Sequence, residues 1–287
     1  MLELDGSVGG GQLLRTALSL AVVTDTPFRI ESIRNGRPNP GLAAQHLAAV
    51  DLVAAYCDAD VEGAELGSET VTFDPGSRRQ SSLEAHVDTA GSVTLLCDTL
   101  LPIAAADDDP VRLTATGGTD VKWAPTVSYY RLVKLPLLAR QGIDAELDLG
   151  ATGFYPAGGG EVTLTVTSSS LSRFDIDTRG DLERVDIHSK AAADLADRSV
   201  ADRQATHASE RLDELGVSAN VVTVDSVETE SLGSSLLLRA VYDDTFAGFS
   251  ALGERGRTSE DVADDAVDAF DRFHAGAAPV DEHMADQ

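Results

Sequence analysis

Short apolar runs and longer apolar stretches alternate along the chain, and glycine or proline residues separate them. Alternating apolar positions predict a strand over residues 2–4, which leads into a glycine-rich turn at 6–12. An apolar helix is predicted over 13–23, and Pro27 ends it before a second strand over 28–33. This order of strand, glycine turn, helix and strand is typical of α/β proteins.

The same order of elements recurs further along the chain. The repeated helices and strand are predicted at 93–106, 111–114 and 127–141. The turns at Gly6 and Gly91 are 85 residues apart, and Pro27 and Pro110 are 83 residues apart. We therefore predict an internal duplication in which two units, near 5–75 and 85–165, superpose. The alternative is a chance similarity between two α/β segments.

The rest of the chain differs from these units in the order of its predicted elements and in the high charge of its helices. A second glycine loop precedes a strand at 161–167, and a serine-rich linker follows it. Further strands are predicted at 185–188, 219–225 and 235–242, and charged helices at 194–215 and 259–274. We predict an α/β (α+β) fold with a core at 1–179, an inserted small α/β domain at 180–276, and the truncated start of a third core unit at 277–287. The alternative for the last segment is a frayed tail.

The chain is strongly acidic, with 48 Asp and Glu against 22 Lys and Arg and a formal net charge of −26. One interpretation is a protein that avoids nucleic acid. The other is adaptation to a very salty cytoplasm, where the Debye length at ~1 M salt is about 3 Å and only local contacts decide binding. The acids are spread along the chain, which favours the second interpretation, so acidity does not exclude an RNA partner.

Composition also bears on localisation. No apolar run reaches the roughly 18 residues that span a bilayer, so we expect no membrane partner. The N-terminus carries Glu3 and Asp5 and lacks a basic segment, so no signal peptide is visible. Cys57 and Cys97 lack metal-ligand spacing and are expected to be buried thiols in a reducing compartment. We expect a cytoplasmic protein.

One loop concentrates the candidate chemistry. Arg34 and Arg37 lie in a stretch rich in proline and glycine, which predicts a stiff extended loop. A helix predicted over 42–56 follows, with Gln45 and His46 in its first turn. Two guanidinium groups, a helix N-terminus and an imidazole suit an anion. The alternative is a surface loop whose arginines pair with neighbouring acids, and composition alone leaves the two interpretations about even.

Taken together, these motifs resemble the RNA 3′-terminal phosphate cyclase family over most of the chain. The matching segments are residues 5–15, 33–42, 45–47, 61–68, 91–102, 117–120, 153–160, 253–256 and 283–287. The resemblance implies repeated α/β units related to the enolpyruvyl transferases, with a small domain inserted after the second unit. The acidic composition suggests a halophilic archaeal member.

The resemblance also implies a reaction. ATP, with Mg²⁺ or Mn²⁺, adenylates a histidine, AMP passes to an RNA 3′-phosphate, and the adjacent 2′-hydroxyl closes a 2′,3′-cyclic phosphate and releases AMP. The alternative within the same fold is a non-catalytic RNA-binding paralogue similar to the family's ribosome-assembly branch. Enolpyruvyl transfer ranks last because only the fold is shared.

Several residues take expected roles from this resemblance. The phosphate and RNA-end group is Arg15, Arg34, Arg37, Gln45 and His46. Nucleotide contacts are expected at Asp98, which stands where the family commonly has glutamine, and at His283, Met284, Ala285, Asp286 and Gln287. Pro125 and Tyr129 are expected to flank the adenine.

Three features depart from the family pattern. The adenylated histidine is expected beyond Gln287, so no residue of this chain is assigned as the catalytic nucleophile. The first glycine loop is short and lacks the glutamate that normally follows its first glycine, which leaves the metal site unassigned. Asp98 adds a negative charge where phosphates or ribose approach. Oligomeric state is not readable from the sequence.

Overall fold

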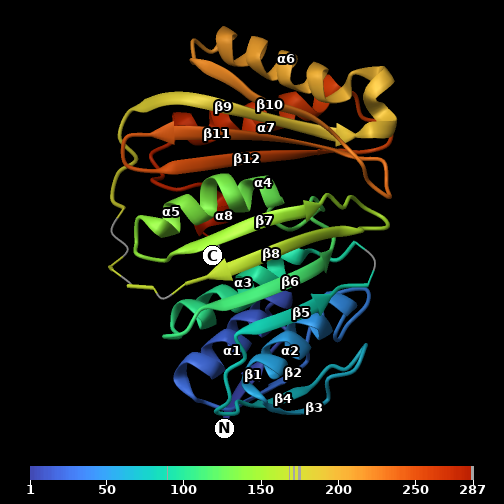
Figure 1. Ribbon diagram of the computed structural model, residues 1–287, viewed down its shortest axis with the longest axis vertical. Coiled ribbons are helices and arrows are strands. Elements are labelled where there is room, and N and C mark those ends of the chain that lie inside the picture. Colours follow the sequence, from blue (N-terminus) through green and yellow to red (C-terminus); the bar gives the residue numbers. More distant parts are fainter. Residues whose placement is uncertain (89, 168, 171, 174–175, 286–287) are drawn as a thin grey trace.

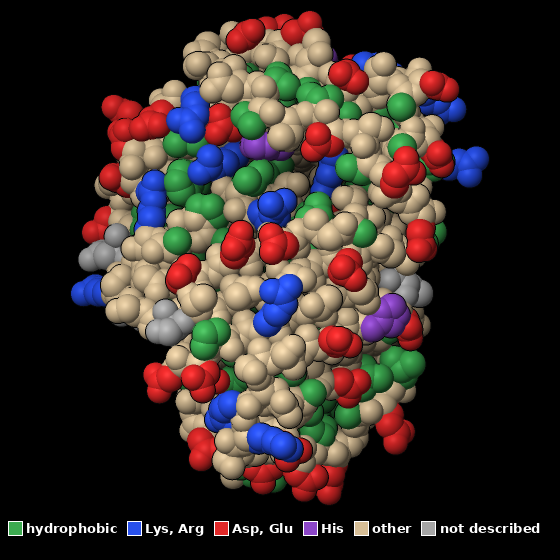
Figure 2. Space-filling view, in the orientation of Figure 1, with side chains coloured by type: hydrophobic (Ala, Val, Ile, Leu, Met, Phe, Trp, Pro, Cys, Tyr) green, Lys and Arg blue, Asp and Glu red, His purple; other side chains and the backbone are tan. Residues whose placement is uncertain are grey.

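The computed structural model describes residues 1–88, 90–167, 169–170, 172–173 and 176–285. Within them, the strands form three four-stranded sheets that are stacked with helices between them (Figure 1). Acidic side chains are spread over the whole face drawn in Figure 2, with lysines and arginines scattered among them. None of the described helices is long and apolar enough to cross a membrane.

The first sheet and its helices come from the N-terminal quarter of the chain. Their elements are β1 (Leu2–Asp5), α1 (Gly11–Thr24), β2 (Phe28–Glu31), α2 (Ala44–Cys57), β3 (Asp60–Glu62) and β4 (Val71–Asp74). The strand order is β1-β2-β4-β3, with β1 parallel to β2 and the other pairs antiparallel.

The second sheet repeats this arrangement. Its unit comprises β5 (Ser82–His86), α3 (Val93–Ala105), β6 (Val111–Gly117), α4 (Val127–Tyr129), the π-helical turn η1 (Tyr130–Lys134), α5 (Leu135–Ala139), β7 (Ala145–Ala151) and β8 (Gly160–Val166). The order is β5-β6-β8-β7, with β5 parallel to β6 and the other pairs antiparallel. The two units therefore share strand order and strand direction, as the predicted duplication requires.

The main core lies between these two sheets. Helices α1, α2 and α3 occupy this layer (Figure 1), and α3 buries eleven of its thirteen residues. A helix that is apolar on all sides is stable only inside a protein. Both cysteines, Cys57 in α2 and Cys97 in α3, are buried thiols without a disulfide, as predicted.

The third sheet comes from the later part of the chain. Its elements are β9 (Leu182–Ala192), the 3₁₀-helix η2 (Ala193–Arg198), α6 (Val200–Glu214), β10 (Ala219–Val227), β11 (Ser234–Tyr242), β12 (Phe246–Gly253) and α7 (Ser259–Ala275), followed by α8 (Glu282–Ala285). The order is β10-β9-β11-β12. The division of the chain at 179 and 276 stays a proposal.

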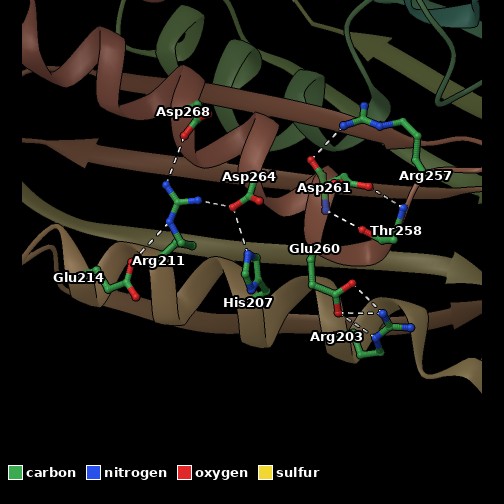
Figure 3. A network of polar contacts seen from close by, with 10 residues as sticks. All are labelled: Arg203, His207, Arg211, Glu214, Arg257, Thr258, Glu260, Asp261, Asp264 and Asp268. Carbon is green, nitrogen blue, oxygen red and sulfur yellow. Dashed lines mark hydrogen bonds and ion pairs between the residues drawn. The ribbon is translucent and has the colours of Figure 1, made fainter.

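The two faces of the third sheet have different neighbours. Helices α6 and α7 cover the outer face, where an ion-pair network joins them through Arg203–Glu260 and Arg211–Asp264 (Figure 3). On the inner face, Leu237 and Phe246 pack in one apolar cluster with Tyr129 and Val133 of the second unit. The third sheet is therefore joined to the second unit by a buried apolar contact.

Three local predictions were wrong. The helix predicted over 194–215 is split at Ser199, whose φ of 48° separates the 3₁₀-helix η2 from α6. The helix predicted over 127–141 is interrupted by η1, immediately before a proline at position 136 that has no N–H for the helical ladder. The loop with the two arginines is turned rather than extended, because Arg34 adopts φ 56° and accepts a 2.9 Å hydrogen bond from the Arg37 N–H. Each proline restricts its own backbone conformation and that of the residue before it, but Arg34 does not precede a proline and can adopt the turn.

Candidate active site

The N-terminus of α1 is where the arginine and histidine side chains meet. A methyl group on Gly11 would lie 2.0 Å from His46 Nε2 and 3.2 Å from Arg15 Nη1. The imidazole from α2 and the guanidinium from α1 therefore rest directly on the Gly11 backbone. Only glycine permits this approach, which explains the glycine at the first position of the helix.

His46 is held as a neutral hydrogen-bond donor. The Ala43 N–H donates to His46 Nδ1 at 3.1 Å, so the ring proton lies on Nε2, the nitrogen that faces Gly11. Burial, followed by the charges of Arg34 and Arg15, lowers the pKa of His46 to about 4. At neutral pH the ring is therefore uncharged and presents an N–H toward the glycine loop.

Arg34 and Arg37 flank the same place. Arg34 Nη1 donates to the Gly41 carbonyl at 2.7 Å, and a methyl group on Gly10 would lie 3.9 Å from Arg37 Nη2. In the part of the chain that the structure describes, neither arginine forms an ion pair with an acid. The alternative of arginines that pair with neighbouring acids is therefore not what the structure shows. We refer to Arg15, Arg34, Arg37 and His46 as the arginine–histidine cluster.

Gln45 links this cluster to the second unit. Its Oε1 accepts a 3.4 Å hydrogen bond from the N–H of Ser92, the N-cap of α3. Its Nε2 is buried and has no hydrogen-bond partner among the described residues. An unpartnered buried donor is a group that a bound anion or water would satisfy.

Beside the cluster is a cleft of about 330 Å³, within the size range of small-molecule sites. Its walls come from α1, from the start of α3, from the loop of residues 121–126, from β12 and from α8. The lining residues are Gln12, Arg15, Leu95, Val121, Lys122, Trp123, Ala124, Pro125, Thr126, Ser250, Leu252 and His283. Arg15 therefore belongs to both the cleft and the arginine–histidine cluster.

Asp98 does not line this cleft. Lys134 of η1 donates to its carboxylate, and the two side chains are 5% and 10% exposed, respectively. Burial lowers the pKa of Arg15, and the negative charge of Asp98 opposes that shift. Asp98 therefore forms a buried ion pair with Lys134, and its expected contact with nucleotide stays a prediction.

Of the described residues expected in the C-terminal nucleotide-binding segment, His283 alone lines the cleft. Met284 lies in the apolar cluster beneath the third sheet, and Ala285 is exposed. Asp286 and Gln287 lie outside the described residues.

Pro125 lines the cleft, as expected of a residue beside adenine. The matching expectation for Tyr129 was wrong. This side chain is fully buried, its hydroxyl donates to Asp281 Oδ1 at 2.7 Å, and its ring packs edge-on against His283.

A metal site is not evident in the described part of the chain, where no group of three His, Cys, Asp or Glu side chains is placed to hold an ion. We therefore derive no step through Mg²⁺ or Mn²⁺. Sequence reasoning also missed Trp123, Ser250 and Lys134. Trp123 could have been recognised as a candidate, because it is the single tryptophan of the chain and shortly follows the glycine-rich motif at 117–120.

Comparison with known proteins gives a consistent result. The sequence profile of a family described as RNA 3′-terminal phosphate cyclase matches residues 7–287. An RNA 3′-terminal phosphate cyclase of Halobacterium salinarum is 45% identical over 298 residues, which cover 100% of this chain and 86% of that protein. Proteins of the same name from Archaeoglobus fulgidus and Methylococcus capsulatus are 41% and 42% identical, and the matches cover 100% of this chain and 85% and 82% of theirs.

Proposed function

Because this chain belongs to the RNA 3′-terminal phosphate cyclase family, we propose that it acts on RNA ends, converting a 3′-phosphate into a 2′,3′-cyclic phosphodiester at the expense of ATP. The observation that carries the proposal is the position of Arg15. This guanidinium is shared by a cluster suited to a phosphate and by a cleft of the size that a nucleotide requires.

The arginine–histidine cluster is proposed to hold the RNA 3′-phosphate. Arg34 and Arg37 supply positive charge, and the Nε2–H of His46 supplies a neutral donor. The N-terminus of α1 adds backbone N–H groups, because its N-cap, Gly10, has no capping side chain. A 2′-hydroxyl on the same ribose is then already close to the phosphorus that it attacks.

The cleft is proposed to hold ATP. Apolar walls from Leu95, Pro125 and Leu252 suit a base, and Arg15 and Lys122 suit phosphates. Transfer of the adenylyl group from ATP releases pyrophosphate and converts the RNA phosphate into a phosphoanhydride with AMP. The 2′-hydroxyl then loses its proton to a base and its oxygen bonds to the RNA phosphorus, while the bond from that phosphorus to the bridging oxygen of the anhydride breaks and AMP leaves.

Neither His46 nor His283 is proposed as the adenylated nucleophile. His46 carries its proton on Nε2 and engages Nδ1 with the Ala43 N–H, so no ring lone pair faces the cluster. His283 packs its ring against Tyr129. We propose that the nucleophile lies beyond Gln287.

The test compares the 287-residue chain with the same chain extended by a relative's C-terminal segment. Both are incubated in about 1 M KCl with ATP, a divalent cation and RNA labelled in its 3′-phosphate. We expect the extended chain to make the label resistant to phosphatase, and the 287-residue chain to bind the RNA with little covalent AMP. RNA binding without cyclisation by either protein would favour the non-catalytic paralogue. An adduct mapped to His46 or His283 would contradict the placement of the nucleophile.

A further inference from the structure

Trp123 has an unusual position for a tryptophan. It lines the cleft, yet its side chain is 94% exposed, the largest exposed aromatic surface described in this protein. Tryptophan is normally largely buried, because its indole has a large apolar surface. An indole at the mouth of a cleft therefore presents flat apolar faces that the protein itself does not cover.

The backbone around Trp123 is held in place. Val121 is buried, and Lys122 forms a 2.7 Å ion pair with Glu254 beyond β12. On the other side of the indole, the carbonyl of Pro125 accepts a 2.7 Å hydrogen bond from Thr94 Oγ1 of α3. Thr126 then caps α4 by accepting from the Tyr129 N–H at 3.1 Å. The exposed indole thus projects from a loop that is fixed at both ends.

The conformation of Trp123 is itself costly. Its φ is 61°, in the left-handed region that bulky residues rarely occupy. Such conformations persist only where the surrounding contacts enforce them, and they concentrate at binding sites. Here the buried Val121 side chain and the buried hydrogen bond from Thr94 to the Pro125 carbonyl hold the chain on either side of Trp123, and the indole faces outward at the cleft.

We propose that Trp123 is a stacking surface for a nucleobase at the mouth of the cleft, supplied either by ATP or by the terminal nucleotide of the RNA. This inference rests on the proposed function, because both bases belong to its substrates. Stacking suits the site because it needs an open flat face rather than an enclosing pocket. It is also insensitive to salt screening, unlike the contacts of a charged surface.

The test uses the fact that Trp123 is the chain's only tryptophan, so its emission reports directly on this position. Emission is titrated with four ligands: ATP, inorganic tripolyphosphate, a 3′-phosphorylated RNA oligonucleotide, and the same oligonucleotide with an abasic terminal nucleotide. Calorimetry follows binding independently of the indole. We expect a base-containing ligand to change the emission at saturation and its base-free counterpart to leave it unchanged. If the emission changes with ATP but not with tripolyphosphate, the base that stacks on Trp123 is adenine. If it changes with the RNA but not with its abasic counterpart, the stacking base is the terminal base of the RNA.

Variants give a second readout. Trp123→Ala should weaken binding of the responding ligand by about 5- to 100-fold and remove the difference between that ligand and its base-free counterpart. Trp123→Phe keeps a flat ring and should retain most of the affinity. Tyr155→Ala removes another exposed aromatic ring, 75% exposed and outside the cleft, and should change nothing.

The outcomes separate this inference from the proposed function. Ligands that bind by calorimetry with unchanged emission, and equally well to Trp123→Ala, would overturn the stacking assignment and leave the proposed function standing. Failure of both ATP and 3′-phosphorylated RNA to bind the unaltered chain would overturn both.

Discussion

Lys134 and Asp98 form a buried ion pair between η1 and α3, and the charge of Asp98 also acts on Arg15, the arginine that joins the cleft to the arginine–histidine cluster. The π-helical turn of residues Tyr130–Lys134 carries the lysine into this position. Single π turns in α-helices are frequent at functional sites. The lysine charge offsets that of the Asp98 carboxylate, whose field opposes the lowering of the Arg15 pKa by burial.

The first prediction concerns this pair. Lys134→Met leaves the Asp98 carboxylate buried without its partner and should lower the free energy of unfolding by about 3–5 kcal/mol. The double variant Asp98→Leu/Lys134→Met removes both charges and should lose much less than the two single changes together. Denaturant unfolding measures both. Arg203→Ala breaks the exposed pair with Glu260 and should cost about 0–1 kcal/mol. Additive losses in the double variant would contradict the pairing.

A second prediction addresses the RNA end. Arg37→Ala should weaken binding of 3′-phosphorylated RNA by about 10- to 100-fold, because a charge-assisted phosphate contact is lost. Binding of the same RNA with a 3′-hydroxyl should change little. Fluorescence anisotropy with a labelled oligonucleotide measures both affinities. Arg203→Ala, on the outer face of the third sheet, is the matched control, and an equal effect there would indicate non-specific electrostatics.

Gly11 provides a third, steric prediction. Gly11→Ala places a methyl group 2.0 Å from His46 Nε2, so the imidazole must move away from the cluster. Affinity for 3′-phosphorylated RNA should fall about tenfold or more. The free energy of unfolding should also fall, because the displaced imidazole loses its hydrogen bond from the Ala43 N–H, although alanine favours the helix in which residue 11 lies. Gly36→Ala lies between the two loop arginines but meets no atom within 4 Å, and unchanged affinity is expected there.

His46 gives a prediction about pH. Its pKa is about 4 in the folded protein against 6.5 for an ordinary histidine, so the unfolded chain binds this proton first as pH falls. Stability is therefore lost between about pH 6.5 and pH 4, by about 3 kcal/mol in total, and this group adds no further change below pH 4. Denaturant unfolding at several pH values measures this. The free energy of unfolding of the unaltered chain, minus that of His46→Gln, should fall as the pH is lowered from about 6.5 to 4. An NMR titration that places the His46 pKa near 6.5 would refute the burial argument.

Some of this arrangement was predictable from the sequence because its causes are local. Pro27 and Pro110 end equivalent helices, and their regular offset was enough to predict two units with the same strand order. The approach of Arg15 to His46 was also predictable, because each residue lies near the N-terminus of a helix in the same unit. These predictions needed only element boundaries and the repeat.

The remainder depends on contacts between distant segments. The cleft walls come from α1, α3, the loop at 121–126, β12 and α8, and no local pattern brings these together. Tyr129 was expected beside adenine, but its hydroxyl meets Asp281, more than 150 positions away in sequence. The pairing of Asp98 with Lys134 likewise depends on the π turn, which a helical pattern does not reveal.

The shared guanidinium of Arg15 has a thermodynamic consequence. A group that contacts two sites makes their occupancies interdependent, because a ligand in one site changes the position of Arg15 and the hydrogen-bond donors that it offers to the other site. Such coupling is reciprocal. Under the proposed function, the factor by which a bound RNA end changes the affinity for nucleotide equals the factor by which nucleotide changes the affinity for the RNA end, and the nucleotide concentration in the cell would set how strongly the protein holds RNA ends.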